Sequence, residues 1–221
     1  MRLKHVKNAE ERIKKGTYYI ESPEEYKATW NKIFKNNNPI HLEIGMGKGD
    51  FIIEKAISNP NTNFIGLEKY DSVIVRAIEK SNELELTNLK LIRIDARKIE
   101  EVFDKEIDTI YLNFSDPWPK DRHAKRRLTS PNFLEKYDHI FKNKPHIIMK
   151  TDNAGLFNYS KESLSEYGYT INEITDDLYK SKYLNGNIPT EYEKKFVSKG
   201  IKINYLKASK KANYIIEDVH K

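Results

Sequence analysis

The chain has 221 residues, 38% of them hydrophobic and 33% charged, with no cysteine and a formal net charge of +6 at pH 7. The absence of cysteine excludes disulfides, a thiolate zinc site and a cysteine nucleophile. No apolar run approaches the roughly 20 residues that span a bilayer, and the basic N-terminus lacks the apolar stretch of a secretory signal, so we expect a cytoplasmic protein without membrane contact.

From residue 39 onward, short apolar runs alternate with longer amphipathic ones, which predicts a parallel sheet wrapped by helices. Two further strands, at 169–177 and 201–209, have no predicted helix between them and indicate antiparallel pairing at the end of the sheet. The predicted fold is α/β, with a doubly wound, mostly parallel, seven-stranded sheet. Strands are expected at 40–44, 63–68, 89–95, 109–114 and 146–151, and helices at 50–58, 72–84, 131–142 and 153–168.

The predicted domain organisation is simple. A basic N-terminal extension covers 1–38, one α/β domain covers 39–208, and a C-terminal tail without an assigned role covers 209–221. The first 15 residues contain six Lys or Arg and two Glu, a local net charge of +4.

A glycine-rich turn follows the first predicted strand, where Glu43 precedes Gly45, Gly47 and Gly49. Glycines let the backbone approach a ligand, and the helix that follows supplies free N–H donors. Glu68 ends the second strand nineteen residues after Gly49, where a carboxylate can accept hydrogen bonds from ribose hydroxyls. A turn that only packs is the alternative, and it explains poorly why three successive strand ends carry acidic residues.

The Gly-x-Gly-x-Gly spacing after an acidic residue resembles the cofactor loop of class I S-adenosylmethionine-dependent methyltransferases. The resemblance implies a Rossmann-like methyltransferase domain in which Glu43 and the three glycines line the cofactor pocket and Glu68 holds the ribose. It also implies that Asp95 and Ala96, after the third strand, lie near the adenine. Spacing alone leaves a dinucleotide or another adenosine-containing cofactor open.

The loop after the fourth strand is the most specific feature, because residues 112–128 read LNFSDPWPKDRHAKRRL. Two prolines stiffen the loop, and Asp116 and Trp118 can hydrogen-bond to a base and stack on it. Residues 120–127 carry five Lys or Arg and one Asp, a net charge of +4 that suits an anionic partner, as does the pI near 9.1. A core role for Trp118 and a merely solvated basic face are the alternatives.

The pattern N-F-x-D-P-W-P-K followed by R-H-x-K-R-R is similar to the hallmark of the bacterial tRNA (guanine-N7)-methyltransferases, and the resemblance covers roughly residues 15–207. It implies tRNA as partner, S-adenosylmethionine as cofactor, S-adenosylhomocysteine as product and no metal. Asp116 would be catalytic and also line the cofactor pocket. The implied substrate residues are Lys120, Asp152, Thr190, Glu191, Tyr192 and Glu193, and the implied RNA-binding residues are Arg122, His123, Lys125, Arg126 and Arg127.

Guanine N7 carries an in-plane lone pair and no proton at neutral pH, so direct attack on a sulfonium methyl needs neither a covalent intermediate nor a general base. Asp152 or Glu193 is expected to accept the N1–H and the amine of the guanine. Three alternatives stay open: another nucleic-acid N-methyltransferase, a nicotinamide-dependent oxidoreductase, and a noncatalytic RNA-binding module. The sequence leaves open whether the protein is a monomer or a homodimer.

Overall fold

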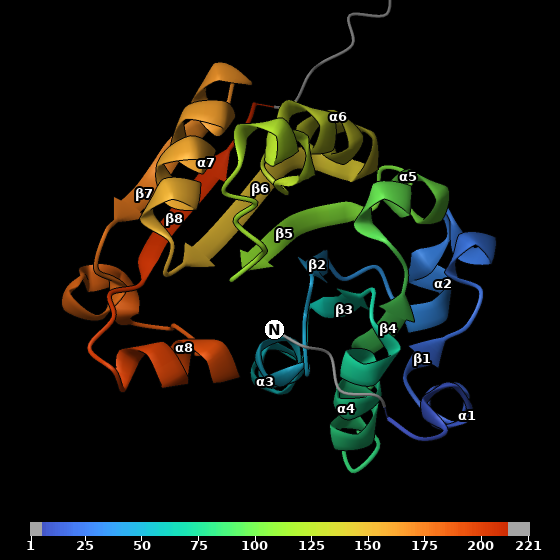
Figure 1. Ribbon diagram of the computed structural model, residues 1–221. Coiled ribbons are helices and arrows are strands. Elements are labelled where there is room, and N and C mark those ends of the chain that lie inside the picture. The colour runs from blue at the N-terminus through green and yellow to red at the C-terminus, as the bar shows by residue number, and fades with distance from the viewer. Residues whose placement is uncertain (1–5, 212–221) are drawn as a thin grey trace, which may run out of the picture.

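An eight-stranded sheet runs through the protein (Figure 1). The structure is a computed structural model, and it describes residues 6–211 of the chain. The strand order is β1-β4-β3-β2-β5-β6-β8-β7. All neighbouring strands are parallel except that β8 runs antiparallel to both β6 and β7. The strands are β1 (Tyr19–Ile20), β2 (Ile40–Ile44), β3 (Asn63–Glu68), β4 (Leu89–Arg93), β5 (Ile107–Asn113), β6 (Phe141–Thr151), β7 (Thr170–Thr175) and β8 (Asn204–Ser209).

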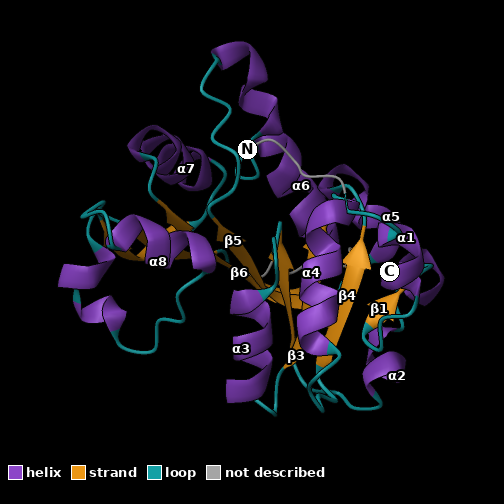
Figure 2. Ribbon diagram, turned by 60° about the horizontal axis from the view of Figure 1, so that its bottom comes forward, coloured by secondary structure: helices purple, strands orange, loops and turns teal. Residues whose placement is uncertain are grey.

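Helices cover both faces of the sheet (Figure 2). Helices α1, α3 and α4 pack on one face around Phe51, Ile52 and Ile74, and helices α2, α5, α6 and α7 pack on the other around Trp30 and Tyr137. The α-helices are α1 (Ala9–Lys14), α2 (Trp30–Phe34), α3 (Asp50–Ser58), α4 (Asp71–Ser81), α5 (Ile99–Val102), α6 (Pro131–Ile140), α7 (Ala154–Glu166) and α8 (Glu191–Val197). This two-sided burial explains why the central strands are nearly continuous apolar runs.

The structure confirms the doubly wound α/β class and the antiparallel strand near the end of the sheet. It has eight strands in place of seven, because the two-residue β1 pairs with β4 at one edge. Residues 1–38 therefore do not all precede the first strand. Trp30 from this segment is fully buried and its indole N–H donates to Val102 O at 3.0 Å.

The prediction that no helix separates the last two strands was wrong. Helix α8 lies between β7 and β8, preceded by two 3-10 turns, η4 (Leu178–Lys180) and η5 (Lys182–Leu184). Helix α8 begins with a capping box in which Thr190 and Glu193 bond each other's backbone N–H groups, so seven residues suffice for a defined helix. The domain boundaries at 38 and 208 stay a prediction, and most of the expected tail, 212–221, lies outside the described residues.

Parallel strands bring their carboxyl ends to one edge of the sheet. The loops after β2, β3, β4, β5 and β6 therefore meet there, and these loops and the strand ends before them contain the predicted site residues from Glu43 to Asp152. Helix α8 lies beside α3 at this edge in both views (Figures 1 and 2). No helix in the described part of the chain is long and apolar enough to cross a membrane.

Candidate active site

The glycine turn between β2 and α3 has the backbone that its sequence predicts. Gly45 and Gly47 have φ values of +78° and +60°, which side chains disfavour, and a Cβ on either residue would meet no other atom within 4 Å. Gly49 is the N-cap of α3. The turn is thus held in a left-handed conformation with open space above its backbone, where a ligand can approach closely.

Glu68, the last residue of β3, connects two of these loops. One of its carboxylate oxygens accepts hydrogen bonds from the N–H groups of Lys69 (2.7 Å) and Tyr70 (3.1 Å), and the other accepts one from Gly47 N–H (3.1 Å). Burial is the largest effect on the pKa of Glu68 and raises it. The three hydrogen bonds lower the pKa, and the charge of Asp116 raises it. Glu68 therefore lies against the glycine turn and within electrostatic reach of the loop after β5.

Glu43 is deeply buried near the end of β2, with 1% of its surface exposed. Its Oε1 accepts a hydrogen bond from the amide of Asn113 at 2.8 Å. Its Oε2 and the Oδ1 of Asn113 have no hydrogen-bond partner within residues 6–211. Burial raises the pKa of Glu43 to about 7, so this carboxyl group takes up a proton far more readily than an exposed one.

Asp95 follows β4, and its carboxylate forms ion pairs with two cationic side chains. It accepts two hydrogen bonds from the Arg97 guanidinium (3.0 and 2.7 Å) and an ion pair from Lys69 at 2.8 Å. The Arg97 hydrogen bond holds the pKa of Asp95 well below its usual range. Ala96, half-buried, begins the next 3-10 turn. The carboxylate is thus charged and fixed, and an adenine beside it would meet a rigid turn.

The loop 114–119 lies directly after β5 and contains two strained residues. Phe114 and Trp118 have φ values of +52° and +42°, in the left-handed region that costs a non-glycine residue about 1–2 kcal/mol. The carboxylate of Asp116 is exposed. Trp118 is half-exposed rather than a core anchor: its ring lies under Arg126 at 4.8 Å and meets His123 edge-on at 5.8 Å.

The basic run does not form one uniform surface. Lys120, Arg122, Lys125 and Arg126 are exposed and His123 is half-buried along the 3-10 helix η3 (Asp121–Arg126). Arg127 is buried. Only part of the predicted RNA-binding run is therefore open to an anionic partner.

The segment that ends in α8 is fastened to the sheet by a buried ion pair. Lys150, near the end of β6, donates to Glu193 Oε2 at 2.6 Å, and both side chains are almost fully buried. The other oxygen of Glu193 accepts from the Asn187 amide (2.6 Å) and the Tyr179 hydroxyl (3.2 Å). Burial lowers the pKa of Lys150, while the charge of Glu193 acts in the opposite direction. Both oxygens of Glu193 thus have protein partners.

The remaining residues of the predicted substrate element lie at the start of α8. Thr190 caps the helix, and Glu191 forms an ion pair of 2.7 Å with Lys48 from the glycine turn. Tyr192 stacks with Phe114 at a centroid distance of 6.5 Å. Asp152 is half-buried directly after β6. The structure thus brings the predicted substrate element, the glycine turn and the loop after β5 together.

These features fit an adenosine cofactor that carries an amino acid group. The open space over Gly45 and Gly47 accommodates a close ligand, and Glu68 has lone pairs left for hydroxyl donors. An ammonium group is the kind of donor that the unpartnered oxygens of Glu43 and Asn113 require. Within residues 6–211 no group of three or more His, Cys, Asp or Glu side chains could hold a metal ion.

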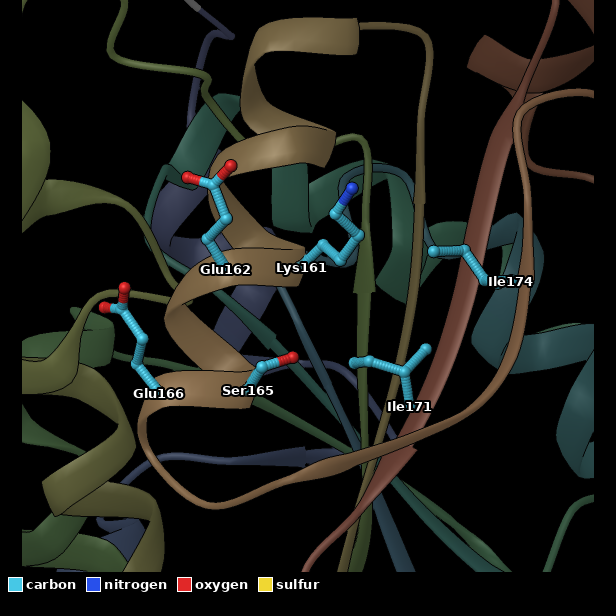
Figure 3. A pocket seen from close by; sticks show the side chains of 6 residues that line it. All are labelled: Lys161, Glu162, Ser165, Glu166, Ile171 and Ile174. Atoms are coloured by element: carbon cyan, nitrogen blue, oxygen red, sulfur yellow. The ribbon is translucent and has the colours of Figure 1, made fainter.

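A separate groove of about 440 Å³ lies between α7 and the edge strand β7 (Figure 3). Figure 3 shows α7 contributing its polar wall and β7 its apolar one. None of the predicted site residues lines it. Its lining residues are Lys161, Glu162, Ser165, Glu166, Ile171 and Ile174.

Comparison with known proteins agrees with the geometry. A family model described as "Putative methyltransferase" matches residues 37–206. A tRNA (guanine-N(7)-)-methyltransferase of Lachnoclostridium phytofermentans is 50% identical over 209 residues, covering 94% of this chain and 98% of the relative. One of Bacillus licheniformis is 47% identical over 202 residues, covering 90% and 94%. The chain belongs to the tRNA (guanine-N(7)-)-methyltransferase family.

Solved structures show the same fold at much lower identity. The 16S rRNA methyltransferase KamB has a TM-score of 0.61 at 11% identity, covering 83% of this chain and 93% of its own. An antibiotic-related methyltransferase has a TM-score of 0.59 at 20% identity, covering 84% and 94%.

Membership in the guanine-N7-methyltransferase family excludes the alternative hypothesis of a nicotinamide-dependent oxidoreductase.

Several residues that build the site were assigned no role in the sequence analysis. Asn113 bonds Glu43, Lys48 reaches α8, and Asn187 and Tyr179 complete the partners of Glu193. The signal for Asn113 was present, because it is a polar residue at the end of a buried strand next to the Asp116 loop. Lys48 and Asn187 lie in loops and Tyr179 in the three-residue turn η4, and no periodicity reveals the contacts of such segments.

The Lys150–Glu193 pair yields a stability prediction. Replacing Glu193 with Gln leaves the Lys150 ammonium buried without its counter-charge, and we expect the free energy of unfolding to fall by about 3–5 kcal/mol. Urea denaturation measures this loss. Glu191→Gln is the matched control, because its exposed pair with Lys48 contributes at most about 1 kcal/mol. Equal losses in the two variants would contradict a structural role for the buried pair, and combining Glu193→Gln with Lys150→Met should recover part of the loss.

Glu43 yields a pH prediction for the protein without cofactor. In the unfolded chain its carboxyl group loses its proton near pH 4.5, but in the folded protein it does so only near pH 7. Ionisation therefore destabilises the folded state increasingly between these two values. We expect Glu43→Gln to be more stable than the wild type at pH 8, by on the order of 3 kcal/mol, and to lose most of this advantage at pH 5.

Urea denaturation at both pH values tests this expectation, with Glu54→Gln on the exposed side of α3 as control. A stability difference between Glu43→Gln and the wild type that is the same at pH 5 and pH 8 would count against the raised pKa.

Proposed function

We propose that this protein transfers the methyl group of S-adenosylmethionine to N7 of a guanosine in tRNA, giving 7-methylguanosine. The observation that carries the proposal is identity near 50% over almost the full length of relatives named for this activity. The site supports it, because acidic groups, a glycine turn and a basic surface meet at one edge of the sheet. We further propose a cytoplasmic location, where such a substrate is found.

Cofactor binding is assigned to the loops after β2, β3 and β4. Glu68 would accept hydrogen bonds from the ribose hydroxyls, Gly45 and Gly47 would allow close approach, and Glu43 would face the amino acid group. Gly49, predicted as a third cofactor contact, would serve the pocket indirectly, because a Cβ there would lie 2.8 Å from the Cβ of Ala77 on α4. Asp95 and Ala96 would border the adenine. Bound S-adenosylmethionine supplies an electrophilic methyl group on a positively charged sulfur.

The chain's own contribution to catalysis would be alignment and charge. Guanine N7 attacks with its lone pair and loses no proton, so the protein need only hold nitrogen, methyl carbon and sulfur in line. Asp116 would orient the guanine, and its carboxylate would balance the positive charge that appears on the purine. Asp116 also borders the cofactor pocket, as its effect on the pKa of Glu68 supports.

Substrate recognition is divided between Asp152 and the surrounding loops. Asp152 is our choice for the carboxylate that accepts the guanine N1–H and amine, because both oxygens of Glu193 already accept hydrogen bonds from protein groups. Glu193 and Thr190 would shape the substrate site by fixing α8, with Glu191 and Tyr192 at its surface. Lys120, Arg122, His123, Lys125 and Arg126 would face the tRNA backbone, which gives affinity and salt dependence rather than base specificity.

The test is transfer of labelled methyl from S-adenosylmethionine to unmodified tRNA, followed by nucleoside digestion and chromatography. Label in 7-methylguanosine is the expected result. Label in another nucleoside would point to a different nucleic-acid N-methyltransferase. Tight tRNA binding without any transfer would favour the noncatalytic RNA-binding module.

Asp116→Asn tests the assigned catalytic carboxylate. The amide keeps the shape but loses the negative charge, so we expect kcat to fall by about 100- to 1000-fold while cofactor affinity changes little. Initial rates and cofactor titration measure the two effects. Asp121→Asn, five residues further on and exposed, is the control and should retain kcat. Near-normal turnover of Asp116→Asn would remove Asp116 from the mechanism.

A further inference from the structure

Arg127 ends the basic run, but its side chain turns inward. Only 9% of its surface is exposed, whereas Arg122, Lys125 and Arg126 are exposed. Its Nε lies 3.2 Å from Pro117 O and 3.3 Å from Trp118 O, and its Nη2 donates to Trp118 O at 3.0 Å. The guanidinium fork therefore holds the backbone of the loop that contains Asp116.

The guanidinium of Arg127 also contacts helix α7. Its central carbon lies 4.3 Å from the centroid of the Tyr159 ring on α7, a cation–π contact. The chain after Arg127 is tied to the same helix, because the hydroxyls of Thr129 and Ser160 are hydrogen-bonded at 2.7 Å and Ser163 donates to Thr129 O at 2.7 Å. Arg127 thus connects the loop to a rigid helix whose apolar face lies in the core.

The loop needs such a partner for two reasons. Pro117 and Pro119 have no N–H groups, so the loop cannot satisfy its own carbonyls with a regular backbone pattern. Phe114 and Trp118 have left-handed φ values, which persist only when neighbouring contacts impose them. The planar fork of arginine reaches two adjacent carbonyls at once, which the compact ammonium of lysine does not.

We propose that Arg127 is a positioning residue, which clamps the Pro117–Trp118 backbone against Tyr159 and so fixes Asp116 for the guanine, rather than a phosphate contact. This inference rests on the proposed function for the role of Asp116. It divides the basic run into two parts. The exposed side chains of Arg122 and Lys125 face the tRNA, and Arg127 acts inside the protein.

Salt dependence separates the two roles of arginine. Each phosphate contact adds about 0.7–0.9 to the slope of log K against log salt concentration. Arg127→Lys and Arg127→Met should therefore leave the salt slope of tRNA binding at the wild-type value, while Arg122→Ala should lower it by nearly one. At saturating tRNA and cofactor, both Arg127 variants should lose about 10- to 100-fold in kcat, because small misplacements of reacting groups have effects of this size.

Acrylamide quenching of tryptophan fluorescence reports the clamp directly. Of the two tryptophans, Trp30 is fully buried and protected, so quenching reports Trp118. Release of the loop in Arg127→Met should increase quenching. Lys142→Ala, exposed at the start of β6, is the control for both measurements and should match the wild type.

Two results would overturn the clamp: an Arg127→Lys variant with wild-type kcat and quenching, or an Arg127→Met variant whose only defect is a lower salt slope. If the Arg127 variants fail to fold, Tyr159→Leu removes the stacking face with Arg127 in place and should show the same loss of kcat and the same increase in quenching. An inactive wild type would overturn the proposed function alone, because quenching and the salt slope of tRNA binding still test the clamp.

Discussion

The buried ion pair between Lys150 and Glu193 is the interaction on which the carboxyl edge of the sheet depends. Through its ammonium group, Lys150 fixes α8 and the preceding turn, and through its backbone carbonyl it accepts the N–H of Phe114 at 2.8 Å, where the Asp116 loop begins. The same ammonium lies 5.0 Å from the ring centroid of Phe51 on α3. Because an isolated buried charge is so unfavourable, these three segments keep one arrangement.

The acidic groups of the proposed cofactor site and the exposed basic run lie beside different strands of this edge. The acidic groups, Glu43, Glu68 and Asp95, lie at or just beyond the carboxyl ends of β2, β3 and β4, on the side that suits a positively charged sulfonium cofactor. The exposed cations of the basic run, Lys120, Arg122, Lys125 and Arg126, follow β5 and suit the phosphates of RNA. Asp116 lies at the boundary, where cofactor and nucleic acid would meet. The surroundings of the acidic groups give them different pKa values, since burial raises the pKa of Glu43 whereas the hydrogen bond from Arg97 lowers the pKa of Asp95.

Sequence periodicity was enough for the main strands and helices, because a sheet buried on both faces requires apolar runs and its helices require amphipathic ones. The predicted ranges 40–44, 50–58 and 63–68 coincide with β2, α3 and β3. Five short elements, β1, α1, α2, α5 and α8, were missed, and none of them is longer than seven residues. Strand β1 has two residues, too few for a pattern, and α8 depends on its capping box and on the Glu193 ion pair rather than on an apolar stripe.

Motifs identified which residues gather at the site but not which way each one points. Arg126 and Arg127 are adjacent and chemically identical. Arg126 lies over the ring of Trp118, whereas Arg127 donates a hydrogen bond to the backbone carbonyl of Trp118. The difference arises because η3 ends at Arg126 and the following residue adopts an extended conformation. Because the two prolines have no N–H groups, carbonyls in the loop lack backbone donors. The inward-turned guanidinium of Arg127 donates hydrogen bonds to these carbonyls instead. A run of charged residues in a motif can therefore contain side chains that stabilise a neighbouring loop as well as side chains that contact a partner. The hydrogen-bonding needs of the neighbouring backbone distinguish the two kinds.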